Sequence, residues 1–245
     1  MELFHLVFLR ALVAKGEDKS LFALKGGCNL RFFFRSVRYS EDMDLDVVVV
    51  SKETLKRKVD RLLDSPAVVA PLKTWGIELV EVSAPKQTDA TQRWKAGLRS
   101  VQFPAPLRTK IELSRRRARD SSTFDAVDPE LLRRYGLSPF LATHYPLAAA
   151  LAQKVDALAG RAVPQARDVF DLNHLLSLGG PEATRLAVDA SNALRAIENA
   201  KAITYDEYSA QVVSYLDPAQ RELFESRDAW NTMKSAVLSR LERVT

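Results

Sequence analysis

Three aspartates alternate along the chain just before a run of four valines. Asp42, Asp44 and Asp46 occupy every second position of the stretch SEDMDLDVVVV. Side chains alternate faces along a β-strand, so the three carboxylates can share one face. Burying like charges costs several kcal/mol each unless a cation or hydrogen-bond donors compensate. Fixed, crowded carboxylate oxygens are what Mg²⁺ binds, so the spacing indicates a metal site. A solvated acidic turn before a strand is the alternative.

A pair of glycines, Gly26 and Gly27, lies one short helix before these aspartates. The pair follows a strand expected at residues 21–26 and opens a helix expected at 28–35. Glycine lets the backbone approach a phosphate closely, and a helix N-terminus offers free N–H groups and a positive dipole end. Most glycine pairs are only turns. In this order, however, the elements predict a triphosphate cradle and a metal site at neighbouring strand ends.

A single acid, Glu112, interrupts the basic and apolar stretch RTKIELSRRR. In a strand, Lys110, Glu112 and Ser114 face one side while Ile111 and Leu113 face the other. Glu112 is either a salt-bridge partner or a third metal ligand that also polarises an incoming hydroxyl group. Two metal ions bridged by such carboxylates clamp the attacking and leaving oxygens in phosphoryl or nucleotidyl transfer.

The positive charge of the chain is concentrated in one segment. Residues 91–120 contain nine Lys or Arg and two acids, a net charge of +7, whereas the whole chain carries +5. Such a run is either a solvent-exposed face or a binding site for a polyanionic partner. We expect the arginines at the strand end, Arg115, Arg116, Arg117 and Arg119, to contact RNA.

A second group of charged residues lies in the C-terminal half, in QKVDALAGRAVPQARDVFDLNHLL. On one helix, Arg167 and Asp171 are four residues apart and can pair, and Asp168 and Asp171 are three apart. Lys154 lies one helix earlier, at the edge of an apolar stripe, from which its ammonium group can reach a cleft. The alternative is an ion-pair ladder on the surface.

The periodicity predicts an α/β half over residues 1–120 and a helical half over 121–245 that closes the active-site cleft. In the first half, 44–50 should form a central strand buried on both faces, because VVVV is apolar throughout. Ser51 should cap a helix over 52–63, and further strands are expected at 77–82, 93–101 and 108–114. From about residue 120 the chain should be almost wholly helical, with helices at 129–135, 147–161, 164–178, 181–200, 206–216 and 227–243.

The remaining composition argues against a disulfide-bonded, a membrane-spanning or a secreted protein. The single cysteine, Cys28, cannot form an internal disulfide and suits a reducing compartment. No apolar run approaches the roughly 20 residues of a membrane span, and the N-terminus lacks the basic region of a secretory signal. A cytoplasmic protein is therefore expected. We expect His5, His144 and His174 to be structural, and Trp75, Trp94 and Trp230 to anchor the core or a domain interface.

Two motifs in this order resemble a known family. The stretch LKGGCNLRFFFRSVRYSEDMDLDV resembles the first motif of the AbiEii/AbiGii-type nucleotidyltransferase toxins, which include MenT-like proteins and belong to the DNA polymerase β-like superfamily. The stretch containing Lys154, Arg161, Arg167, Asp168 and Asp171 resembles a later family motif. The resemblance covers roughly residues 5–180 and implies an α+β fold: a polymerase-β-like nucleotidyltransferase core with a mixed sheet, followed by a helical C-terminal domain.

The resemblance also implies roles for individual residues. Asp42 and Asp44 would bind Mg²⁺, with Glu112 matched to a third metal-binding carboxylate by strand position, and Asp46 would lie outside the metal ligands. The nucleotide would be bound by Lys25, Gly26, Gly27, Ser40 and Lys154. Lys154, Asp168 and Asp171 would join the three metal ligands as catalytic residues. The chain departs from the family pattern at Cys28, where threonine is usual, and at Asn29, where alanine is usual.

The implied activity is that of a Mg²⁺-dependent toxin of a toxin–antitoxin or phage-defence system. It would transfer a nucleoside monophosphate from an NTP to an RNA, with the tRNA 3′ end as the expected acceptor, and so block translation. A cognate antitoxin is the expected protein partner, and no membrane partner is expected. The alternatives are nucleotidylation of a small molecule or a protein, and a nucleotide-binding module without transfer activity.

Overall fold

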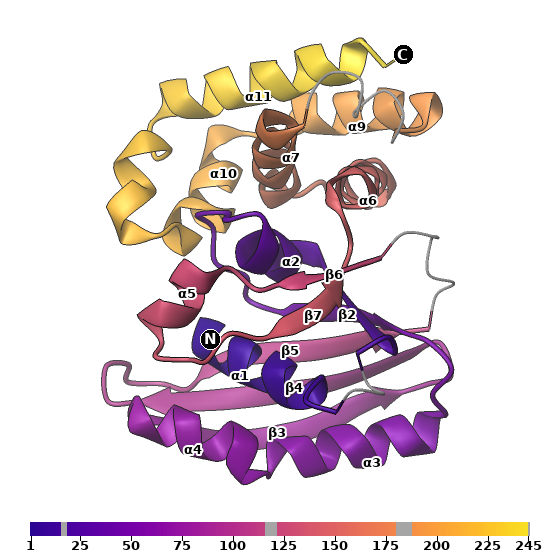
Figure 1. Ribbon diagram of the computed structural model, residues 1–245. Helices are drawn as coiled ribbons and strands as arrows, with labels where there is room; N and C mark the ends of the chain where they lie inside the picture. The colour runs from indigo at the N-terminus through magenta and orange to yellow at the C-terminus, as the bar shows by residue number, and fades with distance from the viewer. Residues whose placement is uncertain (16–18, 116–121, 180–187, 245) are drawn as a thin grey trace. The chain divides into compact units, whose positions relative to one another are not determined.

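A seven-stranded mixed sheet organises the first part of the computed structural model, which describes residues 1–15, 19–115, 122–179 and 188–244 (Figure 1). The strand order is β3-β4-β5-β2-β1-β7-β6. The β1–β7 and β2–β5 pairs are parallel and the others antiparallel. The bounds are β1 Phe22–Lys25, β2 Met43–Val47, β3 Ile77–Gln87, β4 Thr91–Ser100, β5 Leu107–Ser114, β6 Thr123–Ala126 and β7 Leu141–His144. The predicted α+β class with a mixed sheet is confirmed.

The chain divides into two units by its internal contacts. The first comprises Met1–Phe33 and Ser40–Tyr145, and the second comprises Phe34–Tyr39 and Pro146–Thr245. The sequence placed the boundary after residue 120, but the contacts place it after Tyr145. The difference arises because β6 and β7 hydrogen-bond to each other and β7 to β1, which makes them part of the sheet.

The five helices described in the first unit are α1 Glu2–Leu12, α2 Gly26–Phe33, α3 Lys52–Leu63, α4 Pro66–Thr74 and α5 Pro129–Arg134. Helix α3 begins as predicted, because the Ser51 side chain accepts a hydrogen bond from the Thr54 N–H. Helices α1, α3 and α4 pack together and share a buried core with the sheet. Trp94 of β4 faces this core, and its indole N–H donates to Asp60 of α3 over 2.8 Å.

Strand β2 lies at the centre of the sheet but is shorter than predicted. Met43, Leu45 and Val47 are buried on one face, and the strand ends at Val47. Val49 then adopts φ +56° and is 98% exposed. The prediction that all four valines form a strand buried on both faces is therefore wrong after Val47. There the chain turns toward the start of α3 at the cost of a strained backbone at a β-branched residue.

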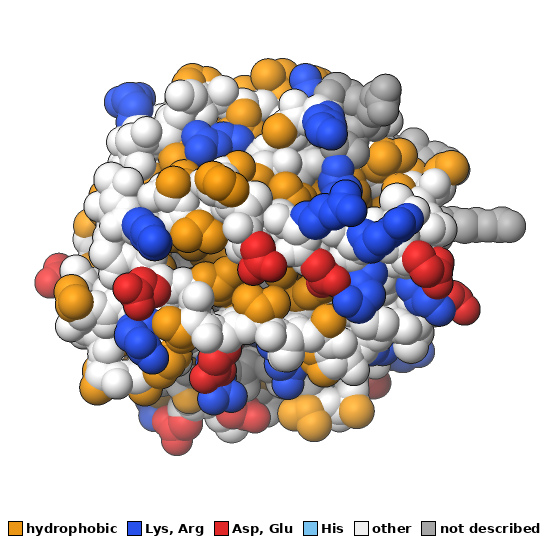
Figure 2. All heavy atoms as spheres, turned by 90° about the horizontal axis from the view of Figure 1, so that it is seen from below, with side chains coloured by type: hydrophobic (Ala, Val, Ile, Leu, Met, Phe, Trp, Pro, Cys, Tyr) orange, Lys and Arg blue, Asp and Glu red, His pale blue; other side chains and the backbone are white. Residues whose placement is uncertain are grey.

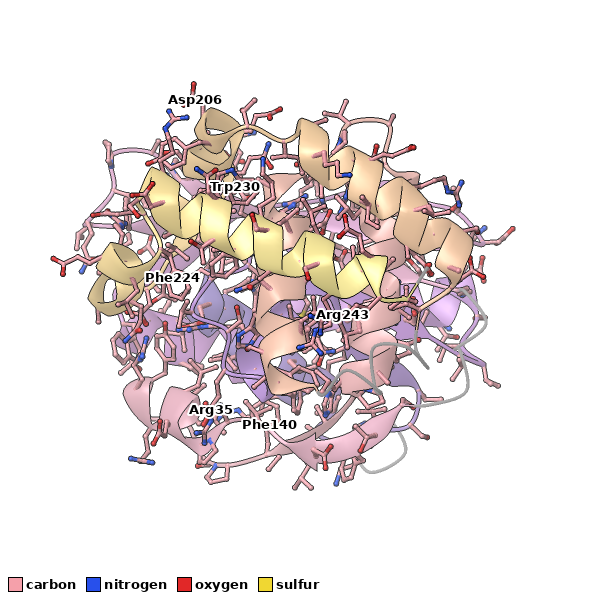
Figure 3. The ribbon with its side chains drawn as sticks, turned by 90° about the horizontal axis from the view of Figure 1, so that it is seen from above. Arg35, Phe140, Asp206, Phe224, Trp230 and Arg243 are labelled. Carbon is pink, nitrogen blue, oxygen red and sulfur yellow. The ribbon has the colours of Figure 1, made fainter. Side chains whose placement is uncertain are left out.

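The second unit is helical. It contains α6 Leu147–Gly160, α7 Ala166–Leu178, α9 Ala190–Ala202, α10 Tyr205–Gln211 and α11 Arg227–Glu242, with 3₁₀ turns η2 Val213–Tyr215 and η3 Pro218–Leu223. Figure 3 looks onto α11, where Trp230 marks the N-terminal half of the helix. Trp230 is fully buried and its ring stacks on Tyr208 of α10 at a centroid distance of 4.5 Å.

The prediction of an almost wholly helical chain beyond residue 120 is wrong for β6 and β7. It is confirmed for the described helices of the second unit, except that the helix expected at 206–216 ends at Gln211. The expected start of a helix at Pro181 lies outside the described residues. Among the helices that are described, none is both long and apolar enough to cross a membrane.

Candidate active site

The turn from β1 into α2 depends on glycine for two reasons. Gly26 has φ +68°, a conformation that favours glycine. A Cβ atom at this position would also lie only 3.0 Å from Oδ2 of Asp44. The carboxylate of Asp44 therefore packs directly against the start of α2, as the order of glycines, helix and aspartates predicted. The absence of a side chain at Gly26 is what leaves room for this carboxylate.

Asp44 occupies the centre of an acidic group on the sheet. In the strand register it lies opposite Glu112 of β5 on one side and Lys25 of β1 on the other. Burial raises the pKa of Asp44, and the carboxylates of Glu112 and Asp42 raise it further, against the opposing effect of Lys110 and Lys25. The fold thus holds a carboxylate where its negative charge is under-compensated.

Asp42 precedes β2 and is held by β5. Its Oδ2 lies 2.8 Å from the ammonium nitrogen of Lys110, and the Lys110 backbone N–H donates to Oδ1 over 3.2 Å. The hydroxyl of Ser40 donates to the carbonyl oxygen of Asp42 over 2.8 Å, and the thiol of Cys28 contacts the same oxygen at 3.2 Å. Ser40 and Cys28 therefore fix the backbone that carries the Asp42 side chain.

Glu112 is ion-paired across the sheet. Its Oε2 lies 2.5 Å from Nη2 of Arg93 and accepts a hydrogen bond from Nε over 2.7 Å. Among the residues that the structure describes, no three His, Cys, Asp or Glu side chains converge on one point that could hold a metal ion. The three predicted ligands lie on or beside adjacent strands, but Lys110 and Arg93 bind two of them.

The residues nevertheless fit a divalent cation. The donors are hard carboxylate oxygens, and the burial that raises the pKa of Asp44 disfavours its charge unless a cation lies beside it. Asp42 and Asp44 would bind such an ion, with Asp42 exchanging its contact with Lys110 for the metal. Glu112 would reach it only by leaving Arg93.

The third alternating aspartate, Asp46, belongs to a separate buried network. It forms an ion pair with Lys25, and its Oδ2 accepts a hydrogen bond from the hydroxyl of Tyr145 over 2.7 Å. Burial and the neighbouring Asp46 raise the pKa of Tyr145, so the phenol stays a donor. This network fixes Lys25 directly before the glycine pair. Sequence reasoning missed Tyr145, which lies 99 positions from Asp46 and carries no local signal.

In the second unit, two buried aspartates of α7 are surrounded by cations. Asp168 and Asp171 are both 0% exposed. Lys154 of α6 lies 3.1 Å from Asp168 and 2.6 Å from Asp171, and Nε of Arg161 lies 2.7 Å from Asp168. Arg38 binds Asp171 through two hydrogen bonds, of 3.0 and 2.8 Å. The sequence motif contains Lys154, Arg161 and the two aspartates, and the structure confirms that they are close together. The contact between Arg38 and Asp171 was not predicted from the sequence.

The charges in this network support one another. Burial alone would raise the pKa of Asp171, but Arg38 and Lys154 outweigh it and hold the pKa at about 2. Burial alone would lower the pKa of Lys154, but Asp171 and Asp168 raise it. Asp171 and Lys154 therefore stay charged near neutral pH. The network is not the exposed ladder considered as the alternative, because both aspartates are buried.

The predicted RNA-binding arginines are only partly described. Arg115 uses its guanidinium inside the first unit, donating from Nε to the Val50 carbonyl over 3.1 Å and from Nη2 to Oε1 of Gln92 over 2.5 Å. It therefore ties the end of β5 to its neighbours. Arg116, Arg117 and Arg119 lie outside the described residues.

The histidine, cysteine and tryptophan residues discussed below contribute to packing. His5 is buried, bonds the Thr109 hydroxyl at 2.7 Å, and has its pKa lowered to about 3 by burial. Cys28 is buried, which raises the pKa of its thiol. Trp94 and Trp230 are core residues, as predicted, but Trp75 is half exposed and packs edge-on against Tyr135 instead.

Comparison with known proteins identifies the family and similar folds. The family model described as nucleotidyl transferase AbiEii toxin, type IV TA system, matches residues 7–243. A protein from H. pylori whose crystal structure is described as that of a candidate nucleotidyltransferase is 17% identical with a TM-score of 0.57, over 99% of this chain and 95% of the other. JHP933 from Helicobacter pylori is 18% identical with a TM-score of 0.54, over 98% of this chain and 91% of the other. The comparison with curated proteins gave no match.

Proposed function

Because the chain belongs to the AbiEii family of nucleotidyltransferase toxins from type IV toxin–antitoxin systems, we propose that it transfers a nucleoside monophosphate from an NTP to a hydroxyl group of an RNA. The observation that carries this proposal is the packing of the Asp44 carboxylate against the glycine that opens α2, with Oδ2 3.0 Å from the position of an added Cβ. This packing supports the proposal because it sets a candidate metal ligand beside a candidate phosphate-binding backbone. The family implies an NTP substrate and an antitoxin partner.

In this proposal the first unit binds the nucleotide. The backbone N–H groups at the start of α2 bind the triphosphate, with the positive end of the helix dipole toward it. Lys25, held by Asp46, adds a positive charge beside the glycine pair. Asp42 and Asp44 would hold Mg²⁺, which would polarise the α-phosphate and offset the charge that develops on the leaving pyrophosphate.

The reaction forms one bond and breaks one. The acceptor hydroxyl oxygen attacks the α-phosphorus, and the bond from this phosphorus to the oxygen that bridges to the β-phosphate breaks to release pyrophosphate. The hydroxyl proton passes to a carboxylate, for which Glu112 is our candidate once it leaves Arg93. Lys154, Asp168 and Asp171 are assigned to the reaction by the family resemblance, and their mutual ion pairs support a role in holding Lys154 charged and fixed.

An RNA acceptor, with the 3′ end of tRNA as the specific candidate, is favoured over a small molecule. The basic residues of the 91–120 segment support this choice, because phosphate contacts provide affinity that does not depend on sequence. The resulting loss of usable tRNA would block translation in the cytoplasm. Nucleotidylation of a small molecule or a protein is the second candidate, since the acidic group would serve any hydroxyl acceptor.

The test is incubation of the protein with each α-labelled NTP in turn, Mg²⁺ and total tRNA, followed by a denaturing gel. We expect label in the tRNA band with at least one NTP, none after chelation of the metal, and none with Asp44→Asn. Label on a small molecule or on protein alone would overturn the RNA assignment. Full transfer by Asp44→Asn would overturn the metal assignment.

A further inference from the structure

One face of β4 and β5 carries a row of basic side chains beside the acidic group. Arg93 and Lys95 of β4 and Arg108 and Lys110 of β5 share this face, because residues two apart in a strand point the same way and the register pairs Lys95 with Lys110. The residues between them, such as Trp94 and Ile111, point into the core. The helices of the core therefore cover the opposite face from the basic row.

Two lysines of this row lie directly opposite each other. Lys95 and Lys110 are cross-strand partners, an arrangement that destabilises a sheet when the charges are alike. Lys110 is partly neutralised by Asp42, 2.8 Å away. Lys95 is exposed and forms no ion pair within the described part of the chain, and its partner in β3 is the uncharged Ser83. A sheet that keeps this repulsion gains from a bound anion.

Arg108 extends the row by one more position along β5. Its side chain is 83% exposed, and its only described salt bridge is a long contact of 3.9 Å to the exposed Glu81. The residue paired with Arg108 in β4 is Gly97, which brings no charge of its own. Positions two apart on a strand are about 6.6 Å apart, and adjacent strands about 4.8 Å. The row therefore presents several positive charges over a surface wider than a single phosphate group.

The sheet order separates this row from the expected nucleotide position. Within β4-β5-β2-β1, the aspartates of β2 have the basic strands on one side and the glycine turn after β1 on the other. A triphosphate bound at the start of α2 would lie on the β1 side. A second phosphate-bearing substrate, whose hydroxyl must meet the α-phosphate at the aspartates, would then approach over β5 and β4.

We propose that the exposed face of β4 and β5, through Lys95 and Arg108, binds the phosphate backbone of the RNA acceptor and directs its reacting end toward Asp42 and Asp44. This inference rests on the proposed function. It replaces Arg115 as an RNA contact, because that guanidinium is used inside the protein. It also favours RNA over a small acceptor, because an RNA backbone offers successive phosphates to separate positive charges.

The helix-covered side of the same unit offers a matched control. On the face seen in Figure 2, which looks from the side of α3 and α4, acidic and basic side chains are interspersed with hydrophobic ones. Lys73 of α4 is exposed and forms no ion pair among the described residues. Lys73→Glu therefore changes the net charge by the same amount as Lys95→Glu without touching the basic row.

The experiment measures binding of fluorescently labelled total tRNA by the full chain across a salt series, for wild type, Lys95→Glu, Arg108→Glu, the double variant and Lys73→Glu. We expect the double variant to raise the Kd at least about tenfold and to reduce the slope of log K against log salt by about one for each charge that contacted a phosphate. Lys73→Glu should behave as wild type, and the KM for NTP should stay unchanged in all variants.

Folding is checked by thermal unfolding, and Lys95→Glu should not lower the Tm, because a carboxylate opposite Lys110 is favourable. The proposal is overturned if the double variant and Lys73→Glu bind tRNA with the same Kd and salt slope, or if wild type does not bind tRNA. Failure of the proposed function gives a different result, since wild type would then bind tRNA but not label it in the NTP assay.

Discussion

At the scale of single residues, Gly26 does more than provide a turn. Its positive φ is shared by Gly136, at +63°, but of these two glycines Gly26 alone has a neighbour at the position of an added Cβ. We expect Gly136→Ala to cost about 1–2 kcal/mol of unfolding free energy, the usual penalty for the left-handed conformation. Gly26→Ala should cost more and weaken NTP binding severalfold, because it also displaces Asp44. Urea unfolding and NTP titration of the two variants check this, and equal losses would show that Asp44 is not displaced.

Asp44 should make the metal-free protein pH-dependent. Its pKa is raised in the fold, so the folded state binds a proton that the unfolded state has released, and stability falls as the pH rises from the unfolded toward the folded pKa. Acidification through this range should therefore stabilise the metal-free wild type more than Asp44→Asn, which has no proton to bind there. Melting curves of both proteins in chelator, taken from pH 4 to 7, measure the difference. At neutral pH the variant should melt higher while losing transfer.

Tyr145 is the residue expected to matter most among those the sequence did not reveal. Tyr145→Phe keeps the ring but leaves Oδ2 of the buried Asp46 without its donor. Loss of a hydrogen bond to a charged group should cost about 1.5–3 kcal/mol in urea unfolding. Because Asp46 also holds Lys25, the KM for NTP should rise more than kcat falls. Tyr205→Phe, whose hydroxyl donates to a neutral carbonyl near the surface, should cost about 1 kcal/mol and leave the KM unchanged.

At the scale of elements, the segment Phe34–Tyr39 joins α2 and β2 of the first unit yet belongs to the second. Backbone hydrogen bonds connect Tyr39 to Tyr215 and Asp217 to Val37. Arg38 reaches from this segment to Asp171 of α7. The charged network therefore holds this connecting segment within the helical unit.

Removing Arg38 should expose how much this network depends on pairing. In Arg38→Met, Asp171 keeps Lys154 but loses its two-point partner while remaining buried, so the unfolding free energy should fall by about 3–5 kcal/mol. The low pKa of Asp171 means that its stabilising charge is present above the unfolded pKa and lost as the pH falls toward 2. Acid unfolding of the variant should begin at higher pH. Adding Asp171→Leu should restore part of the stability, and no recovery would contradict the pairing argument.

At the scale of the whole molecule, the uneven distribution of charge should make the KM for tRNA depend on the salt concentration, but not the KM for NTP. The chain carries +5 overall and +7 within residues 91–120. At subsaturating tRNA, transfer should fall steeply between about 50 and 200 mM salt as counterions compete, whereas the KM for NTP, set by metal and backbone contacts, should change little. Initial rates against each substrate across the series measure this. A KM for NTP that rises as steeply as the KM for tRNA would contradict separate binding surfaces.

The sequence by itself determined the features that depend on local periodicity. Helix α3 with its Ser51 cap, the glycines at the start of α2 and the shared face of Lys110 and Glu112 all follow from side-chain spacing within one element. Two motifs in order also predicted the family. These patterns are readable because each places its residues within one or two helical turns or a few strand positions.

Only the tertiary structure decided which charges meet. Asp171 is paired with Arg38, 133 positions away in the sequence, and Asp46 is hydrogen-bonded to Tyr145, 99 positions away. The periodicity of a single helix or strand gives no information about contacts at such separations. Strands β6 and β7, of four residues each, are too short to show an alternating pattern and exist because the sheet edge accepts their hydrogen bonds. The end of β2 at Val47 is likewise set by the turn into α3, since β-propensity favours all four valines equally.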